Sequence, residues 1–155
     1  DAALASQARP VIVVTGHARA EVELALSGLP VTIVHNADYG TGMASSLRRG
    51  LEAAGDVDGI IVLLADMPRI SPALVDALLQ VFIQNSKADA AVAIHEGRRG
   101  NPVLLGRNLF EAIRGLEGDE GARRLLAGKT VVEVAGDATI ALDIDTPEAL
   151  RQVQK

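Results

Sequence analysis

The sequence contains no cysteine, and this absence excludes disulfide bonds, thiolate metal sites and cysteine nucleophiles. Only 2% of the residues are aromatic although 48% are hydrophobic, so the core must consist of aliphatic side chains. Aliphatic cores of this kind are typical of parallel sheets covered by helices. No apolar run approaches the roughly 18 residues of a membrane span, and no signal peptide is visible. We therefore expect a soluble cytoplasmic protein without a membrane partner.

Basic residues are also scarce, because 15 Lys and Arg against 20 Asp and Glu give a net charge of −5. Extended binding to nucleic acid requires a basic face, so a nucleic-acid partner is not expected. A small phosphorylated ligand remains compatible with this charge, since backbone amides and a divalent cation can hold it. The length of 155 residues fits one domain, and no repeat, low-complexity segment or linker divides it.

Short apolar runs alternate with helical patterns along the chain. Predicted strands are 11–14, 31–34, 60–65, 90–94, 102–105 (paired with the strand before it) and 131–134. Predicted helices are the remnant at 1–7, 18–26, one carrying Met43, Leu47 and Leu51 on one face, one starting at Ser71-Pro72, 109–115, 121–127 and one starting at Thr146-Pro147. This alternation predicts an α/β sheet that is largely parallel.

An acid directly follows the most hydrophobic run, since Asp66 comes after Ile60–Ala65. Ligands of parallel α/β sheets bind beyond the carboxyl ends of the strands, where a carboxylate can coordinate Mg²⁺. Taken alone, Asp66 is better explained as a turn residue that accepts backbone N–H bonds before the helix starting at Ser71.

A second acidic motif lies near the C-terminus, where "LDIDTPEAL" places Asp143 and Asp145 two residues apart. This spacing puts both carboxylates on one side of an extended segment. Taken alone, helix capping by Asp145 or Thr146 is an equally good explanation. Together with Asp66, the two acids could clamp one metal ion. "DIDT" also suggests an aspartyl-phosphate phosphatase, but that motif should follow the first strand of its fold, so this alternative has little weight.

A glycine-rich turn, "YGTGMASS", leads into a predicted helix and offers free amides with the hydroxyls of Ser45 and Ser46. Such a surface could hold a nucleobase edge or a ribose, and a flexible turn with capping serines is an equal alternative. The segment lacks the third glycine of a dinucleotide fingerprint.

The arginines of "EGRRGNP" could bind phosphate, or form a solvated hairpin tip. The histidines are too scattered for a metal site, and only His17 is predicted near the strand ends.

Six segments, in order, resemble those of the MobA-like NTP transferase family, with the closest pattern in its molybdenum cofactor cytidylyltransferases. They are "VVTGH", "HNADYGTGMASSLRRGL", "LLADMP", "GRRGNPVLLGR", "GDEGARRLL" and "LDIDTPEAL". The resemblance implies a Rossmann-like, three-layer α/β/α fold of the nucleotide-diphospho-sugar transferase type. It further implies transfer of CMP or GMP from an NTP, with CTP favoured, to the terminal phosphate of molybdopterin, and release of pyrophosphate. A molybdoenzyme or its chaperone is a further implied partner.

The resemblance also assigns roles to residues. It implies Asp66 as the principal Mg²⁺ ligand and Asp145 as the second, both catalytic, with Asp143 nearby as a third metal-binding carboxylate. The implied nucleotide-binding residues are Gly40, Thr41, Gly42, Met43, Ser45 and Ser46. The implied acceptor-binding residues are Arg99, Gly100, Asn101 and Pro102.

One departure from the family pattern is large, because the family begins with a strand and a glycine-rich loop, "LAAGxSxRMG", that cradles the triphosphate. This chain starts instead with "DAALASQARP". We therefore expect residues 1–155 to form a single, N-terminally truncated domain without its first strand and phosphate loop. Such a chain should be weakly active or inactive by itself. The alternatives are a non-catalytic binding or cofactor-delivery domain, or a cytidylyltransferase for an isoprenoid or sugar phosphate, and the fold does not choose among them.

Overall fold

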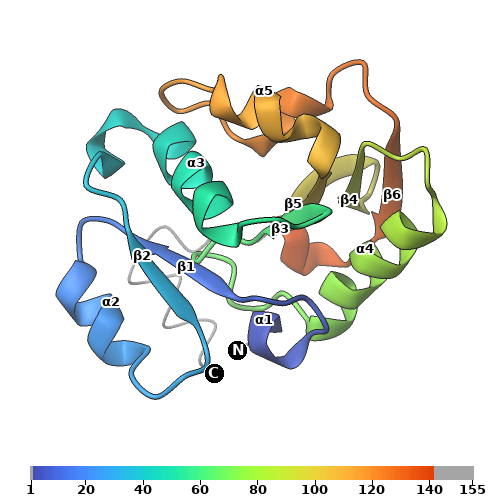
Figure 1. Cartoon of the computed structure of the whole chain (residues 1–155). Helices are drawn as coiled ribbons and strands as arrows, with labels where there is room; N and C mark the ends of the chain where they lie inside the picture. Colours follow the sequence, from blue (N-terminus) through green and yellow to red (C-terminus); the bar gives the residue numbers. More distant parts are fainter. Residues whose placement is uncertain (1, 142–155) are drawn as a thin grey trace.

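The computed structural model describes residues 2–141 as an alternation of helices and strands (Figure 1). The helices are α1 (Ala2–Ala5), α2 (Arg19–Ala25), α3 (Met43–Ala54), α4 (Pro72–Gln84) and α5 (Phe110–Arg114). The strands are β1 (Ile12–Thr15), β2 (Thr32–His35), β3 (Gly59–Val62), β4 (Ala90–His95), β5 (Arg98–Gly106) and β6 (Val131–Ala135). Short 3₁₀ segments are η1 (Tyr39–Thr41), η2 (Arg107–Leu109), η3 (Ala122–Leu126) and η4 (Ala138–Ala141). The predicted α/β class is confirmed, and the helix predicted at Thr146 lies outside the described residues.

The strands form two hydrogen-bonded sheets within the described residues. β1 and β2 pair in parallel, and the other sheet has the order β3-β5-β4-β6. In that sheet β4 and β6 are parallel, whereas β5 is antiparallel to both β3 and β4. β3, β4 and β6 therefore share one direction, and β5 opposes them. The predicted hairpin of β4 and β5 turns through Glu96 and Gly97, both at positive φ, as a two-residue type I′ turn requires.

Helices cover both faces of the four-stranded sheet. On one side of the sheet, Val92 and Val103 pack in a core cluster with residues of α3 and α5. Their neighbours in sequence, Ala91 and Leu104, are buried on the opposite side with Leu78 of α4. Alternate residues of a strand face opposite sides of a sheet, so this pattern defines the middle layer of three. The predicted three-layer arrangement is confirmed.

The start of α4 follows its sequence signal closely. Ser71 is the N-cap, and its hydroxyl accepts a hydrogen bond from the Leu74 N–H at 3.2 Å. Pro72 follows at the first helical position, where its missing N–H has no cost. Both features were predicted, and they fix the exit of the segment that carries Asp66.

β3 is shorter than predicted, because it ends at Val62 instead of Ala65. The following residues form turns, with the Met67 N–H donating to the Leu64 carbonyl at 3.4 Å. Met67 is only 5% exposed and packs in a core cluster that includes α4 residues. The apolar run therefore continues past the strand because Leu63 and Leu64 pack against the same core cluster. Asp66 is half-buried and lies within the turn after these residues, not directly at a strand end.

None of the helices in residues 2–141 is both long enough and apolar enough to span a membrane.

Candidate functional site

Asp66 has an unusual environment for a carboxylate. Its Oδ1 atom is buried and has no hydrogen-bond partner among the described residues. A buried polar atom without a partner is costly, and far more so when it carries charge. The local alternative, in which Asp66 serves as a hydrogen-bond acceptor in the turn, does not account for this oxygen. A hard cation accounts for it, because carboxylate oxygen is the preferred ligand of Mg²⁺ and of Mn²⁺.

The rest of the predicted metal site is not described by the structure. Asp143 and Asp145 lie outside residues 2–141, so their distance from Asp66 is not tested. Within those residues, no group of three or more His, Cys, Asp or Glu side chains is arranged to hold a metal ion. Asp66 therefore fits a metal ligand, and the pairing with the second acidic motif stays a prediction.

The buried side chain of Asn36, which is 4% exposed, makes three hydrogen bonds within the loop that follows β2. Its Nδ2 donates to the Ser45 Oγ at 2.8 Å and to the Ser46 Oγ at 3.0 Å, and its Oδ1 accepts from the Asp38 N–H at 3.0 Å. The Ser45 hydroxyl in turn donates to the Gly42 carbonyl at 2.8 Å. Of the predicted nucleotide-binding residues, Ser45 is thus buried and bonded inside the loop, whereas Gly40, Thr41 and Met43 are exposed.

The same loop is packed against a turn that lies far away in sequence. The Ala44 N–H donates to the Gly118 carbonyl at 3.0 Å. At Gly42, which has φ +110°, a Cβ atom would lie only 2.3 Å from the Gly118 carbonyl carbon and oxygen. A Cβ at Gly121 would lie 3.0 Å from the Met43 sulfur. The segment "GDEGARRLL" therefore belongs to the candidate site as the wall behind the loop.

The end of β1 contacts the loop from another direction. Gly16 allows a close approach, because a Cβ there would lie 2.8 Å from the Tyr39 Cβ. The His17 Nδ1 lies 3.4 Å from the Tyr39 hydroxyl, and the two rings pack edge to face with centroids 6.0 Å apart. Sequence reasoning missed Tyr39, although it is the only tyrosine of the chain and is 44% exposed beside the glycine-rich turn.

The predicted acceptor-binding residues lie at the start of β5. The Arg99 guanidinium is bound to Glu133 of β6, with Nε 2.8 Å from Oε1. Gly100 packs on Ile140, since a Cβ there would lie 2.8 Å from the Ile140 carbonyl oxygen. Pro102 is fully buried, so it supports the strand and does not present a surface to a ligand.

The predicted residues fall into two groups in space. Ile140, which contacts Gly100, shares a core cluster with Met67, so the acceptor segment and the Asp66 turn belong to one side of the sheet. Ala44, at the start of α3, belongs to the core cluster on the other side. A substrate that reaches both groups would have to lie beyond the carboxyl ends of the strands, where ligands of α/β sheets bind.

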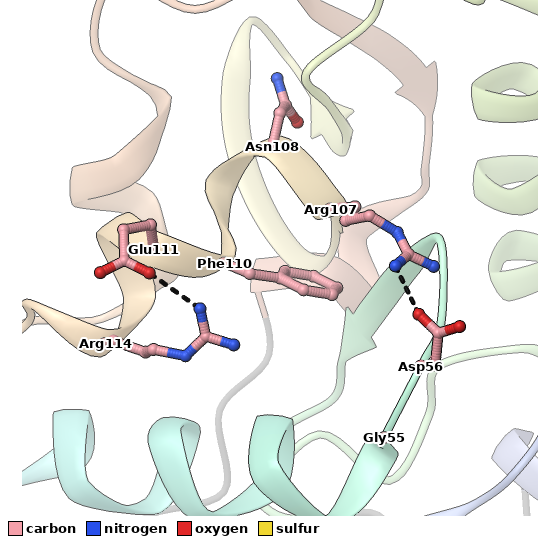
Figure 2. A pocket seen from close by; sticks show the side chains of 7 residues that line it. All are labelled: Gly55, Asp56, Arg107, Asn108, Phe110, Glu111 and Arg114. Carbon is pink, nitrogen blue, oxygen red and sulfur yellow. Dashed lines mark hydrogen bonds and ion pairs between the residues drawn. The ribbon is translucent and has the colours of Figure 1, made fainter.

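A hollow of about 400 Å³ lies away from these residues, between the α3–β3 connection and α5 (Figure 2). Arg107 donates to Asp56 at 2.5 Å and to Asp58 at 3.2 Å, and the Asp56 hydrogen bond raises the pKa of the guanidinium. Arg114 is paired with Glu111 at 2.9 Å. Both arginines are matched by carboxylates, so the hollow offers no uncompensated positive charge to a phosphate.

A second hollow, of about 340 Å³, lies at the N-terminus of α4 and includes Asp137 and Thr139. The Thr139 hydroxyl donates to Asp137 Oδ1, and its backbone N–H donates to the same oxygen at 2.9 Å. These hydrogen bonds, the hydroxyl first, lower the pKa of Asp137 below its ordinary value of 3.8. Ionised Asp137 is thereby stabilised in the folded state.

Replacing Thr139 with valine is expected to raise the pKa of Asp137 towards its ordinary value, because the hydroxyl donor is lost while the N–H donor stays. A carboxyl whose pKa is lowered by folding contributes stability above its unfolded pKa, and the contribution disappears as pH falls through the folded pKa. The part of the stability difference between wild type and T139V that comes from ionised Asp137 should therefore disappear in acid. An NMR titration of the Asp137 carboxyl carbon measures the pKa, with Thr32→Val on β2 as a control that leaves it unchanged.

The fold is an α/β domain of three layers, with the Asp66 carboxylate, one of whose oxygens is buried without a partner among the described residues, on one side of the sheet and a glycine-rich loop on the other. A family model described as the MobA-like NTP transferase domain matches residues 1–135. The chain belongs to this family, and its fold is that of the nucleotide-diphospho-sugar transferases.

Curated relatives carry several different names. The chain is 36% identical over 128 residues to the purine catabolism protein PucB of Bacillus subtilis, covering 79% of this chain and 60% of that protein. It is 33% identical to nicotine blue oxidoreductase of Paenarthrobacter nicotinovorans, covering 90% of this chain and 72% of the relative. It is 28% identical to molybdenum cofactor cytidylyltransferase of Escherichia coli, covering 89% and 70%. The chain thus spans well under the full length of each.

Solved structures agree with the family. The Rv0371c protein of Mycobacterium tuberculosis H37Rv, in complex with manganese, superposes with a TM-score of 0.83 at 25% identity, covering 98% of this chain and 80% of that chain. A nucleotidyl transferase from Methanothermobacter thermautotroptrophicus gives 0.81 at 28% identity, covering 98% and 74%.

Proposed function

We propose that the full-length protein transfers a nucleotidyl group, CMP in preference to GMP, from an NTP to the terminal phosphate of a small acceptor such as molybdopterin. The observation that carries this proposal is the buried Asp66 Oδ1, which has no hydrogen-bond partner among the described residues of a chain from a nucleotidyltransferase family. A structural aspartate would be expected to use that oxygen in a hydrogen bond.

Each group of residues has a separate task in this proposal. Asp66 holds Mg²⁺, with Asp145 and Asp143 as the further carboxylates, and the bound ion would supply charge neutralisation for the phosphates. The exposed loop residues Gly40, Thr41 and Met43 contact the base and ribose, and the buried Ser45 holds the loop in place. Arg99 and Asn101 face the acceptor, and Gly100 and Pro102 support the strand that carries them. An acceptor phosphate oxygen forms a new bond to the α-phosphorus of the NTP, while the bond from that phosphorus to the leaving oxygen breaks. Pyrophosphate departs with the bonding electrons, and no covalent enzyme intermediate is needed.

The preference for CTP and for a pterin acceptor rests on resemblance. The "GMASS" form of the loop resembles the cytidylyl branch more than the guanylyl branch, and the Escherichia coli relative is named a molybdenum cofactor cytidylyltransferase. PucB is named for purine catabolism and the Paenarthrobacter relative for an oxidoreductase, which is why the acceptor is part of the proposal. A molybdoenzyme or its chaperone would receive the product.

We further propose that a strand and a phosphate-binding loop outside residues 1–155 complete the domain. The curated relatives are longer than this chain, which supports the proposal. The division of the sheet also supports it, because within the described residues β1 pairs with β2 and β3 pairs with β5, in two separate sheets.

The test is an assay of pyrophosphate release by full-length protein with Mg²⁺, molybdopterin, and either CTP or GTP. We expect release that requires the acceptor and is faster with CTP. Residues 1–155 alone should be slower by about a hundredfold or more, because the triphosphate cradle is lost. The non-catalytic alternative instead predicts that full-length protein neither releases pyrophosphate nor binds NTP in calorimetry, and that result would overturn the proposed function.

A further inference from the structure

Asn36 is a buried asparagine that uses its whole side-chain amide inside the candidate nucleotide-binding loop. It lies directly after β2, where its backbone N–H donates to the Thr15 carbonyl at 2.9 Å and anchors it to β1. The two amide hydrogens go to Ser45 and Ser46, and the amide oxygen goes to the Asp38 N–H. Asn36 thereby links the end of the sheet to both ends of the loop.

We propose that Asn36 is a positioning residue for NTP binding, which acts through the loop of residues 38–46 without touching the nucleotide. This inference rests on the proposed function, because it assigns a second layer of residues behind the same site. Asn36 is 4% exposed, whereas Gly40, Thr41 and Met43 at the surface of the loop are exposed. The ligand can therefore reach the loop, and Asn36 lies behind it.

The hydrogen bonds of Ser45 show how the positioning works. A serine hydroxyl has one hydrogen to donate and can accept from a neighbour. The Asn36 amide donates to this oxygen, so the Ser45 hydrogen points to the Gly42 carbonyl at 2.8 Å or the Asp38 carbonyl at 3.1 Å. Those carbonyls flank η1, so Asn36 and Ser45 together fix the path of the exposed turn.

Asparagine is well matched to this position. The site needs two N–H donors and one acceptor on a short side chain, and only a primary amide of this length supplies them. Aspartate lacks the donors, and glutamine is longer by one methylene in a closely packed place. An alanine would leave the Asp38 N–H without its side-chain partner and the Ser46 hydroxyl without its donor.

The test compares Asn36→Ala with Asn108→Ala in full-length protein. Asn108 also donates a side-chain hydrogen bond, to Asp89, but lies beside the hollow of Figure 2 and away from the loop. In N36A we expect faster hydrogen exchange confined to the amides of residues 38–46. We also expect the KM for the NTP to rise about tenfold with kcat within about threefold, because the loop loses its preferred conformation before binding. N108A should show neither effect.

A double-mutant cycle separates positioning from direct contact. Because Asn36 and Ser45 act through one network, the KM effects of N36A and S45A should not multiply in the double variant. Multiplying effects would mean that Ser45 binds the NTP by itself, and would overturn the inference. If N36A does not fold, Asn36→Ser takes its place in the same comparison.

The two proposals fail in different ways. Wild-type protein that transfers no nucleotide contradicts the proposed function. Active wild-type protein together with an N36A variant of unchanged KM, or of unchanged exchange in residues 38–46, contradicts the positioning role alone. A uniform loss of kcat with a lowered melting temperature would likewise show that Asn36 is merely structural.

Discussion

Replacing Asp66 with asparagine is expected to lower the rate of nucleotidyl transfer by about a hundredfold or more, and to leave the fold intact. The amide keeps the shape of the side chain but removes the negative charge that holds a divalent cation and, through it, the phosphates. Pyrophosphate release with CTP and acceptor measures the rate. Titration of Mn²⁺ and NTP into the protein by calorimetry measures the loss of metal binding independently of turnover.

The stability of the same variant gives a second and opposite signature. The Asp66 Oδ1 has no hydrogen-bond partner among the described residues, so replacing the carboxylate removes a charge that is costly to bury in the absence of metal. D66N should therefore be at least as stable as wild type in metal-free buffer. Asp76→Asn is a matched control, because the half-buried Asp76 accepts from the Gln7 N–H at 2.7 Å, which an amide oxygen can also do. A D66N variant with wild-type activity would remove Asp66 from the site.

Much of the fold could be predicted because its signals are local. Ser71-Pro72 marks the start of α4 by a cap and a proline, and both act within one helical turn. Glu96-Gly97 lies between two apolar runs and forms the tight turn of the β4–β5 hairpin. In each case the physical cause lies within a few residues of the element that it determines.

The end of β3 could not be predicted in the same way. Residues 63–65 are as apolar as the strand before them, and hydrophobicity does not distinguish a buried strand from a buried loop. Leu63 and Leu64 pack against the core cluster that contains Met67 and residues of α4. That contact depends on the arrangement of the layers, so only the structure shows that Asp66 lies in a turn with one oxygen enclosed.

The role of Ser45 illustrates the same limit at the site. Its place near the start of α3 suggested a free hydroxyl, since the first turn of a helix is usually open. In the structure Asn36 and Gly42 use this hydroxyl, and the resulting network also fixes Asp38. The glycine-rich pattern correctly located a loop, but which of its groups remain available to a ligand depends on neighbours outside the pattern.

The close contact between Gly42 and the turn at residues 117–121 leads to the other large effect. Gly42 has φ +110° and ψ 175°, a combination that residues with a Cβ rarely adopt. An added Cβ would also lie 2.3 Å from the Gly118 carbonyl carbon and oxygen, which belong to backbone and cannot rotate away. Strain and collision therefore act on the same methyl group.

Gly42→Ala is expected to lower the free energy of unfolding by about 3 kcal/mol, because the loop must leave its conformation or displace the turn. Gly28→Ala separates the two causes, since Gly28 also has positive φ (+80°) but nothing lies within 4 Å of its added Cβ. That control should cost only about 1 kcal/mol. Urea denaturation of both variants measures the difference, and equal losses would show that the turn yields freely. Since the Ala44 N–H is bonded to the same Gly118 carbonyl, G42A should also raise the KM for the NTP. G28A should leave this KM unchanged, because Gly28 lies in the connection between α2 and β2, outside the loop of residues 38–46.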